Sequence, residues 1–218
     1  MSTERDSRLH WIYASQSADQ LRERYDVWAV DYDSDLDDMQ WKAPQAAAGR
    51  CGFFAQPGAE ILDAGCGTGR VGVSLSELGH ARIVGLDLST GMLAKSAARA
   101  VYAELHQGSL LDRLPFDDDR FASVVSVGVF TLGHVDGSAF AELARVTSPG
   151  GHVTITFLDD AFDRLGYRVE QQRLVDSGAW EVAEVTEPLA LLHEDGNDIM
   201  LRVWTWRVLS KAGRPDTH

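Results

Sequence analysis

Residues 61–70 read Ile61-Leu62-Asp63-Ala64-Gly65-Cys66-Gly67-Thr68-Gly69-Arg70, and this stretch decides the fold. Its apolar start predicts a buried strand, and a helix is predicted to begin at Arg70. The alternate glycines between them let the backbone turn sharply and approach a ligand with no Cβ in the way. The start of the helix offers unpaired N–H groups. The stretch therefore predicts a ligand-binding loop between a strand and a helix.

The glycine spacing separates two kinds of cofactor loop. A dinucleotide-binding fingerprint reads Gly-x-Gly-x-x-Gly, whereas Arg70 stands three positions after Gly67. Asp63 would repel a pyrophosphate and attract a cation, and S-adenosylmethionine carries a sulfonium and an ammonium against one carboxylate. The loop is therefore predicted to bind S-adenosylmethionine, with contacts from Asp63, Ala64, Gly65, Cys66 and Gly67.

Length and composition limit the classes of partner. The chain has 218 residues, 44% of them hydrophobic, which is enough for one substantial core. A net charge of −13 argues against nucleic acid. Cys51 and Cys66 provide neither a disulfide framework nor a Cys-x-x-Cys metal site, and the histidines lack metal-ligand spacing. Neither a leader segment nor a run of about eighteen apolar residues is indicated. We therefore expect a cytoplasmic protein with a small-molecule partner, no metal and no membrane contact.

Strand and helix patterns alternate after Pro57-Gly58. Strands are predicted at 59–64, 81–88, 103–110, 121–129 and 152–157, with helices at 70–78, 90–101 and 138–146. This rhythm indicates parallel βαβ units. A helical stretch, 161–177, is followed by two long strands, 180–192 and 199–209, around the turn Glu194-Asp195-Gly196-Asn197, which predicts an antiparallel hairpin.

The first 55 residues are predicted to form a helical cap. Leu21, Tyr25, Trp28 and Tyr32 recur at spacings of four, three and four, so they share one helix face. Residues 1–55 are expected to pack on a cofactor-binding domain, 56–218, as one compact unit. Tyr25 and Tyr32, with Trp28 and Trp41, would shield a sulfonium, because electron-rich rings attract cations. The alternative is that these rings only attach the helices to the sheet.

The carboxyl ends of parallel strands predict where the ligand lies. Asp87 ends the second strand and can accept hydrogen bonds from both ribose hydroxyls; the alternative is an acid at a helix N-terminus. Leu88 and Met92 offer apolar contact to adenine, with core packing as the alternative. Ser109 and Leu110 follow the third strand, where a small polar residue can bond the adenine amino group or simply form a turn.

The fourth strand is predicted to end beside the transferring methyl group. Val127, Gly128 and Phe130 would lie there, with core packing as the alternative. His134 is the best-placed base, or else a solvated loop histidine. Methyl transfer from a sulfonium needs chiefly positioning and exclusion of water. The predicted substrate-binding residues are Trp28, Trp41, Phe130 and His134.

Charged residues near the loop leave alternatives open. Lys42, Arg70 and Arg22 are candidate partners for the cofactor carboxylate, with none favoured by the sequence. The aspartates between 31 and 38 either repel anionic substrates or keep the surface soluble, and solubility is the preferred reading.

These residues resemble the class I S-adenosylmethionine-dependent methyltransferases. The matching stretches are Asp63-x-Gly65-x-Gly67-x-Gly69, Asp87, Leu114-Pro115-Phe116, and Leu143-x-Arg145 to Pro149-Gly150-Gly151. Within that superfamily the chain is similar to the Williams–Beuren syndrome region methyltransferase-like proteins. That closer similarity is carried by Tyr25-Asp26-x-Trp28-Ala29-x-x-Tyr32-Asp33, Lys42-Ala43-Pro44 and Gly178-Ala179-Trp180-Glu181.

The resemblance implies an α/β, Rossmann-like three-layer sandwich with a seven-stranded, mostly parallel sheet whose last strand is antiparallel. It implies cofactor contacts from Asp63, Gly65, Gly67, Asp87 and the ends of the third and fourth strands. It also implies that the segment from Tyr25 to Tyr32 closes over the methionine part of the cofactor.

The sequence thus predicts a methyltransferase (EC 2.1.1) that moves a methyl group from S-adenosylmethionine to an oxygen, nitrogen or sulfur of a small molecule by in-line displacement. The demethylated product would be S-adenosylhomocysteine, and the protein would be a monomer or homodimer. Two alternatives stand beside this prediction. One is a noncatalytic S-adenosylmethionine-binding sensor or scaffold, and the other is a nicotinamide-dependent oxidoreductase.

Overall fold

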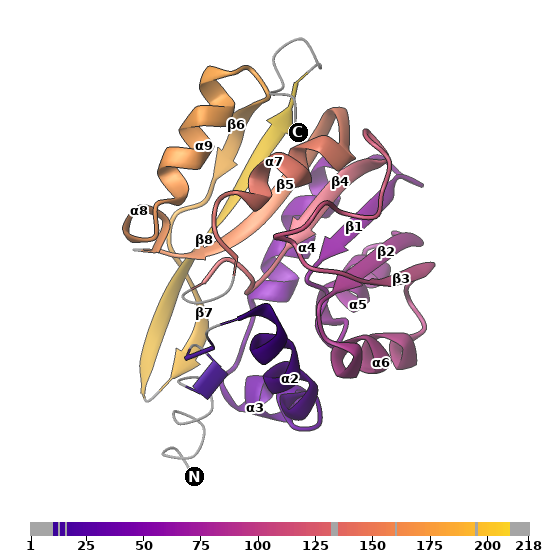
Figure 1. Ribbon diagram of the computed structural model, residues 1–218, viewed down its shortest axis with the longest axis vertical. Helices are drawn as coiled ribbons and strands as arrows, with labels where there is room; N and C mark the ends of the chain where they lie inside the picture. Colours follow the sequence, from indigo (N-terminus) through magenta and orange to yellow (C-terminus); the bar gives the residue numbers. More distant parts are fainter. Residues whose placement is uncertain are drawn as a thin grey trace.

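A mixed β-sheet with helices on both faces forms the centre of the computed structural model, which describes residues 11–12, 14–15, 17–131, 135–159, 161–194 and 196–209 (Figure 1). Five strands run parallel in the order β3-β2-β1-β4-β5. Their bounds are β1 Glu60–Ala64, β2 Arg82–Asp87, β3 Glu104–Gln107, β4 Phe121–Ser126 and β5 Thr147–Leu158. The predicted Rossmann-like α/β fold is therefore confirmed.

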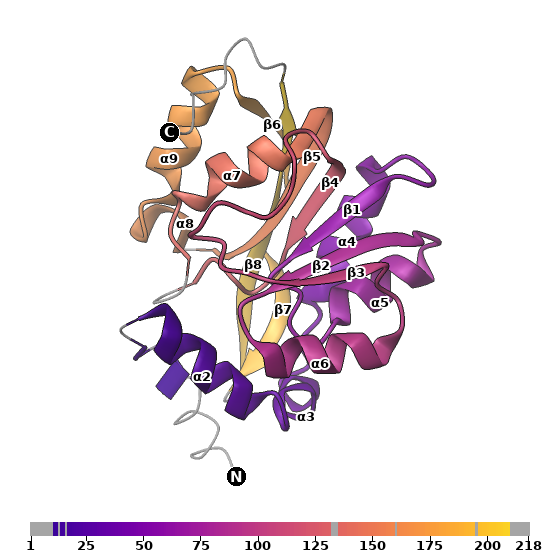
Figure 2. The same ribbon diagram turned by 45° about the vertical axis from the view of Figure 1, so that its right-hand side comes forward.

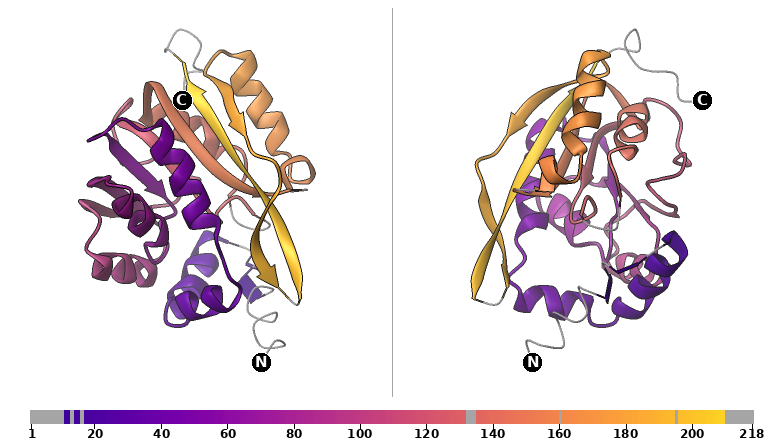
Figure 3. Two further views of the ribbon diagram at one scale, coloured as in Figure 1. Left: turned by 180° about the vertical axis from the view of Figure 1, so that it is seen from behind. Right: turned by 60° about the vertical axis from the view of Figure 1, so that its left-hand side comes forward.

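The side chains of the parallel strands point alternately into two apolar layers, one on each face of the sheet. Ile61 and Leu62 are neighbours in β1, yet they belong to different hydrophobic clusters, because successive side chains of a strand point to opposite faces. The Ile61 face is covered by α4 (Ala43–Phe54) and α5 (Arg70–Glu77), and Figure 3 shows α4 across the sheet from behind. The Leu62 face is covered by α7 (Ala139–Val146) and α9 (Tyr167–Asp176). Both faces of the parallel strands are therefore buried.

The carboxyl-terminal hairpin completes the sheet. The long strand β8 (Asn197–Val208) pairs antiparallel with β5 on one side and with β6 (Trp180–Val185) on the other. The predicted strand 180–192 is interrupted: β7 (Leu189–Glu194) pairs with the first part of β8 and β6 with the last part. Pro188 precedes β7, and a proline has no N–H to donate to a ladder. Within the described residues the sheet therefore has eight strands, one more than predicted, because the strand 180–192 is divided.

Two glycines with a positive φ account for two further differences from the predicted elements. The predicted helix 161–177 consists of α8 (Ala161–Arg164) and α9, and Gly166 between them has a φ of +80°. The predicted turn at Gly150 lies inside β5 as an irregularity, where the pairing with β4 shifts between Phe121 and Ser123. A positive φ favours glycine at both positions.

The amino-terminal helices lie at the carboxyl ends of the parallel strands (Figure 2). They are α2 (Ala18–Trp28) and α3 (Tyr32–Asp38), whereas α4, the last helix of the predicted cap, packs on the face of the sheet. The helix α6 (Thr90–Arg99) lies beside α2. The tip of the hairpin meets them, because the Lys42 N–H donates to the Leu191 carbonyl at 2.7 Å and the His193 N–H to the Met39 carbonyl at 2.8 Å. None of the helices in the described ranges combines the length and the hydrophobicity that a membrane span requires.

Candidate functional site

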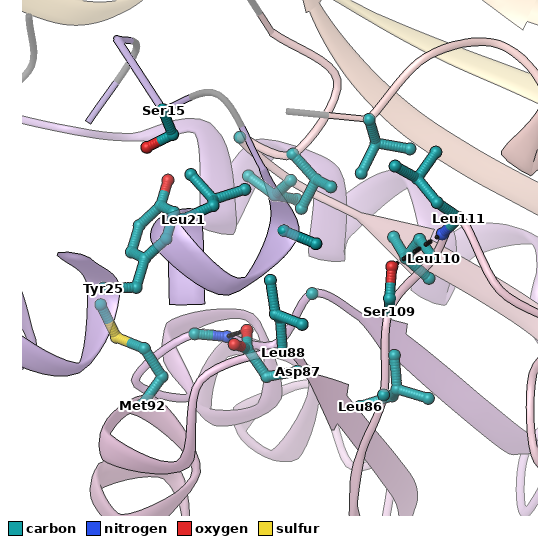
Figure 4. Close-up of a pocket in the computed structure, with 18 of the residues that line it drawn as sticks. Ser15, Leu21, Tyr25, Leu86, Asp87, Leu88, Met92, Ser109, Leu110 and Leu111 are labelled. Carbon is teal, nitrogen blue, oxygen red and sulfur yellow. Dashed lines mark hydrogen bonds between the residues drawn. The ribbon is translucent and has the colours of Figure 1, made fainter. Parts of the chain in front are cut away.

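A cavity of about 390 Å³ lies between the carboxyl ends of the strands and α2 (Figure 4). Leu21 and Tyr25 of α2 face Asp87 and Leu88, and Ser109 lies on a further side. The cavity brings together most of the predicted cofactor residues, namely Tyr25, Tyr32, Gly65, Gly67, Asp87, Leu88, Met92, Ser109, Leu110 and Val127. Of these, Asp87, Leu88, Ser109, Leu110 and Val127 were predicted from the carboxyl ends of the strands, whereas Tyr25 and Tyr32 were predicted from the helix face that they share.

The Asp87 carboxylate ties the glycine loop to the start of α6. Its Oδ2 accepts a hydrogen bond from the Gly67 N–H at 2.8 Å, and its Oδ1 accepts one from the Ser89 N–H at 2.9 Å. Burial raises the pKa of Asp87 to about 6, and the backbone N–H groups of Ser89 and Gly67 act in the opposite direction. The carboxylate is thus held in one orientation at the wall of the cavity.

Four N–H groups of the loop donate hydrogen bonds within the protein. The N–H groups of Gly65 and Cys66 donate to the Leu86 carbonyl, that of Gly67 to Asp87, and that of Gly69 to the Cys66 carbonyl. A diphosphate needs several free backbone donors at such a loop. This arrangement disfavours a diphosphate more directly than the charge of Asp63 does.

Two glycines of the loop have different reasons for lacking a side chain. Gly65 has a φ of +81°, and a Cβ there would lie 2.3 Å from Val129 Cγ2. Gly67 has a φ of +53°, and a Cβ there would meet nothing within 4 Å. Because Gly67 lines the cavity, that open space is ligand space. The loop therefore has a packed side at Gly65 and an open cradle at Gly67.

Asp63 and Ala64 form the base of the loop and do not line the cavity. The Asp63 carboxylate is fully buried and accepts a hydrogen bond from the Tyr102 hydroxyl at 2.7 Å. The Ala64 carbonyl accepts one from Ser126 Oγ at 2.7 Å. The prediction that Asp63 faces the ligand is thus corrected, because its side chain points into the protein beneath the loop.

Tyr102 is a residue of the site that sequence reasoning missed. Its ring lies beneath the loop, against Gly69, Gly72 and Gly85. Glycine is unfavourable inside a helix or a strand, and both Gly72 in α5 and Gly85 in β2 lie inside such elements. These two glycines were the signal in the sequence that a bulky group approaches there.

Two aspartates of the cap attach it to the loop and to α6. Asp26 Oδ1 accepts hydrogen bonds from Ser89 Oγ at 2.6 Å and from the Gly91 N–H at 2.8 Å. Asp33 accepts one from Thr68 Oγ1 at 2.6 Å and one from Arg99 Nη2 at 2.5 Å. The interpretation of residues 31–38 as a solubilising run is therefore wrong for Asp33.

Trp28 supports the cavity wall from behind. It is buried outside the cavity lining, and its Nε1 donates to Asp35 Oδ2 at 2.8 Å. Its ring lies 5.8 Å from that of Tyr25 and 4.6 Å from that of Tyr32, measured between centroids. The predicted substrate contact of Trp28 is corrected: it orients the two tyrosines that do line the cavity.

The remaining predicted substrate residues are dispersed. Phe130 is fully buried in the aromatic core, 5.2 Å from Phe140 between ring centroids, because the chain turns it away from the sheet edge. Trp41 lines a smaller cavity of about 30 Å³ together with Cys66 and Arg70. His134 lies outside the described residues. Phe130 therefore has no place in a substrate site.

The two cavities share one wall, formed by Tyr32, Gly65, Gly67 and Val127. Arg70 lines the smaller one and is paired with Asp37 and Asp33. Arg22 lies near Asp19 and Asp26, and Lys42 is exposed. Of the three candidate cations, Arg70 is the one that lines a cavity. In the part of the chain that the structure describes, no cluster of His, Cys, Asp and Glu could hold a metal ion.

Several known proteins resemble this chain. A family model described as "Methyltransferase domain" matches residues 61–151. The human "Methyltransferase-like protein 27" is 37% identical over 166 residues, which are 72% of this chain and 66% of that protein. A "Demethylmenaquinone methyltransferase" of Mycobacterium tuberculosis (strain ATCC 25618 / H37Rv) is 38% identical over 119 residues, 54% of this chain and 47% of that protein. The chain thus spans less than two thirds of either relative.

A solved structure shares the fold. It is the putative methyltransferase in complex with the Trm112 methyltransferase activator of Haloferax volcanii. The TM-score is 0.67 at 21% identity, with 85% of this chain and 98% of that chain covered. At that identity the likeness concerns the architecture of sheet and helices.

Proposed function

The chain belongs to the class I S-adenosylmethionine-dependent methyltransferases, and on that premise we propose that it transfers a methyl group to a small molecule from S-adenosylmethionine bound in the larger cavity. When bound, this cofactor supplies an electrophilic methyl group on a sulfonium. The chain would contribute binding, orientation and exclusion of water, which is most of what in-line displacement requires.

One observation carries the proposal: an oriented carboxylate, an open glycine cradle and apolar walls meet in one cavity. Asp87 lines it with both oxygens fixed by backbone N–H groups. We propose that remaining lone pairs of Asp87 accept from the ribose hydroxyls. Leu88 and Met92 would cover one face of the adenine, and Ser109 would bond its edge.

The cap supplies the other wall. Tyr25 and Tyr32 line the cavity and are oriented by Trp28. We propose that these electron-rich rings face the sulfonium and exclude water from it. Gly65, Gly67 and Val127, which line both cavities, would face the amino-acid end of the cofactor.

The acceptor is proposed to be small, uncharged and largely apolar. Among the described lining residues, Asp87 is the one charged side chain, and Leu21, Val129 and Val135 are apolar. Leu111, also in the lining, is 47% exposed and lies where the cavity meets solvent. The mycobacterial relative is named for demethylmenaquinone. Aromatic hydroxyl compounds are therefore the first acceptors to test.

Calorimetry tests the binding half of the proposal. S-adenosylhomocysteine should bind the wild-type protein, and Asp87→Asn should weaken binding by ~1–3 kcal/mol, since one hydrogen-bond acceptor is lost. Asp117→Asn is the matched control, because Asp117 is an exposed carboxylate outside the cavity. Absence of binding at millimolar ligand would refute the proposal.

An acceptor screen tests the catalytic half. Release of S-adenosylhomocysteine is measured with phenols, hydroquinones, amines, thiols and carboxylates at saturating cofactor. Turnover with an uncharged aromatic acceptor supports the proposal. Tight cofactor binding without turnover of any acceptor would favour the sensor or scaffold instead, since a fold alone does not prove chemistry.

A further inference from the structure

Tyr102 fills a slot beneath the glycine loop that three glycines leave open. A Cβ added to Gly72 would lie 2.3 Å from Tyr102 Cζ, and Cβ atoms at Gly69 and Gly85 would lie 3.2 and 3.1 Å from its ring carbons. These glycines come from the loop, from α5 and from β2. A side chain at Gly72 would displace the ring. Tyr102 therefore fits here because these three positions carry no side chain.

The Tyr102 hydroxyl reaches a buried carboxylate. It donates to Asp63 Oδ2 at 2.7 Å, and Asp63 is 0% exposed. Within the described residues the other oxygen, Oδ1, has no hydrogen-bond partner. A buried carboxylate is costly unless it is hydrogen-bonded, so this hydroxyl is the main side-chain support of an ionised Asp63. Asp63 stands two residues before Gly65, at the base of the bend that lines the cavity.

We propose that Tyr102 is a positioning residue that acts through Asp63: it keeps that carboxylate ionised beneath the loop and so makes the site prefer a cationic cofactor over its neutral demethylated product. This inference rests on the proposed function. The contact is indirect, because Asp63 does not line the cavity and exerts its effect as a charge.

A buried charge changes the affinity for one of these two ligands relative to the other, whereas packing contacts to their shared parts affect both alike. S-adenosylmethionine and S-adenosylhomocysteine share the adenosine and the amino acid and differ in one methyl group and one positive charge. Contacts to the shared parts cancel in the ratio of the two dissociation constants. A negative charge in a poorly solvated place near the sulfur favours the sulfonium, and salt screens it little.

The groups that face Asp63 are consistent with this role. The titratable groups are Tyr102, Asp87, Cys51 of α4 and Cys66 of the loop, and the Gly72 N–H also stabilises the ionised form of Asp63. Burial raises the pKa of Cys51 to about 12 and raises that of Cys66 as well, so both thiols are neutral near pH 7. Asp87 is common to the binding of both ligands. Burial raises the pKa of Asp63 to about 7, and the Tyr102 hydrogen bond opposes this increase.

The test is calorimetric titration of both ligands into the wild type, Tyr102→Phe, Asp63→Asn and the double variant at pH 8. Tyr102→Phe keeps the ring and removes the hydroxyl. We expect it to weaken S-adenosylmethionine about 3- to 10-fold more than S-adenosylhomocysteine. Asp63→Asn should shift the ratio likewise, and the double variant should shift it no further than Asp63→Asn alone.

Each outcome decides. If Tyr102→Phe weakens both ligands equally, the ratio of the two dissociation constants is unchanged and the residue only supports packing. If it weakens neither ligand, the inference is overturned as well. If Tyr102→Phe does not fold, Asp63→Asn still tests the effect of the charge. The ratio of the two dissociation constants in the wild type should then move toward that of Asp63→Asn as the pH falls from 8 to 6. If neither ligand binds the wild type, the proposed function fails first.

Discussion

The Asp26 carboxylate of α2 accepts a hydrogen bond from the Ser89 hydroxyl at 2.6 Å, so a residue of the cap contacts the start of α6, 63 positions away in the chain. Ser89 in turn is the N-cap of α6, and its Oγ accepts from the Met92 N–H at 3.0 Å. Asp26 also accepts from the Gly91 N–H. The cap is thus fixed to α6, the helix that follows β2, at the end where an anion is favoured.

Asp26→Ala should loosen the cap. Partial burial raises the pKa of Asp26, but the hydrogen bonds from Ser89 and Gly91 outweigh it and leave the pKa below its usual value. Removing the carboxylate should lower the free energy of unfolding by ~1–2 kcal/mol, as loss of a helix cap does. Urea denaturation measures this change. Asp26→Asn, which keeps one oxygen acceptor, should lose less; an equal loss in both variants would contradict a capping role.

Cofactor affinity should fall at acidic pH because of Asp87. Its pKa is raised to about 6 in the protein, so it gains a proton as the pH falls from 7 to 5. Protonation removes an acceptor for the ribose hydroxyls, and the affinity for S-adenosylhomocysteine should decrease several-fold. Calorimetry at pH 5, 6, 7 and 8 shows the curve. The same decrease in Asp87→Asn would assign it to another group.

The periodicity and the strand-end rule predicted most of the cavity, because they depend on local pattern and on the geometry of parallel strands. Asp87, Met92 and Ser109 were located in this way. The failures concern side-chain direction. Phe130 follows a strand end as Val127 does, yet it faces the core and Val127 faces the cavity. Spacing along the chain does not reveal where the backbone turns between them.

The contacts of the cap could not be predicted from the sequence either. Asp33 and Asp38 look alike in an acidic run, but Asp33 meets Thr68 and Arg99 through tertiary contacts across more than 30 positions. The same holds for Tyr102, whose partner Asp63 is 39 positions away. Such pairs depend on how α3 and the segment after α6 dock, which hydrophobic pattern does not determine.

The two glycines of the loop should respond differently to alanine. Gly65→Ala introduces a left-handed residue with a Cβ 2.3 Å from Val129, so it should lower stability by ~2–4 kcal/mol. Gly67→Ala carries the backbone strain alone, about 1–2 kcal/mol, but its methyl group enters the cavity. Thermal unfolding with and without S-adenosylhomocysteine separates the effects. Gly67→Ala should lose most of the stabilisation by ligand, and a full ligand response in that variant would place the ligand elsewhere.

Wild type and Asp63→Asn should differ in the pH dependence of stability. The pKa of Asp63 is about 7 in the folded protein and 3.8 without burial, so the folded state binds the proton more tightly. The free energy of unfolding of the wild type, relative to the variant, should therefore decrease as the pH rises from about 4 to 8. Urea denaturation of both proteins at pH 5 and pH 8 measures the difference. A constant difference would mean that Asp63 does not titrate in this range.

Phe130→Ala should behave as a core substitution. The ring is fully buried against Phe140, Phe157 and Tyr167, so its truncation leaves a cavity and should lower the free energy of unfolding by ~3–5 kcal/mol. Phe130→Leu keeps most of the volume and should lose less. Because the ring does not line the ligand cavity, Phe130→Leu should bind S-adenosylhomocysteine as tightly as the wild type does. Urea denaturation and calorimetry on the same preparations check both statements. Weakened ligand binding without loss of stability would mean that Phe130 does contribute to the ligand site.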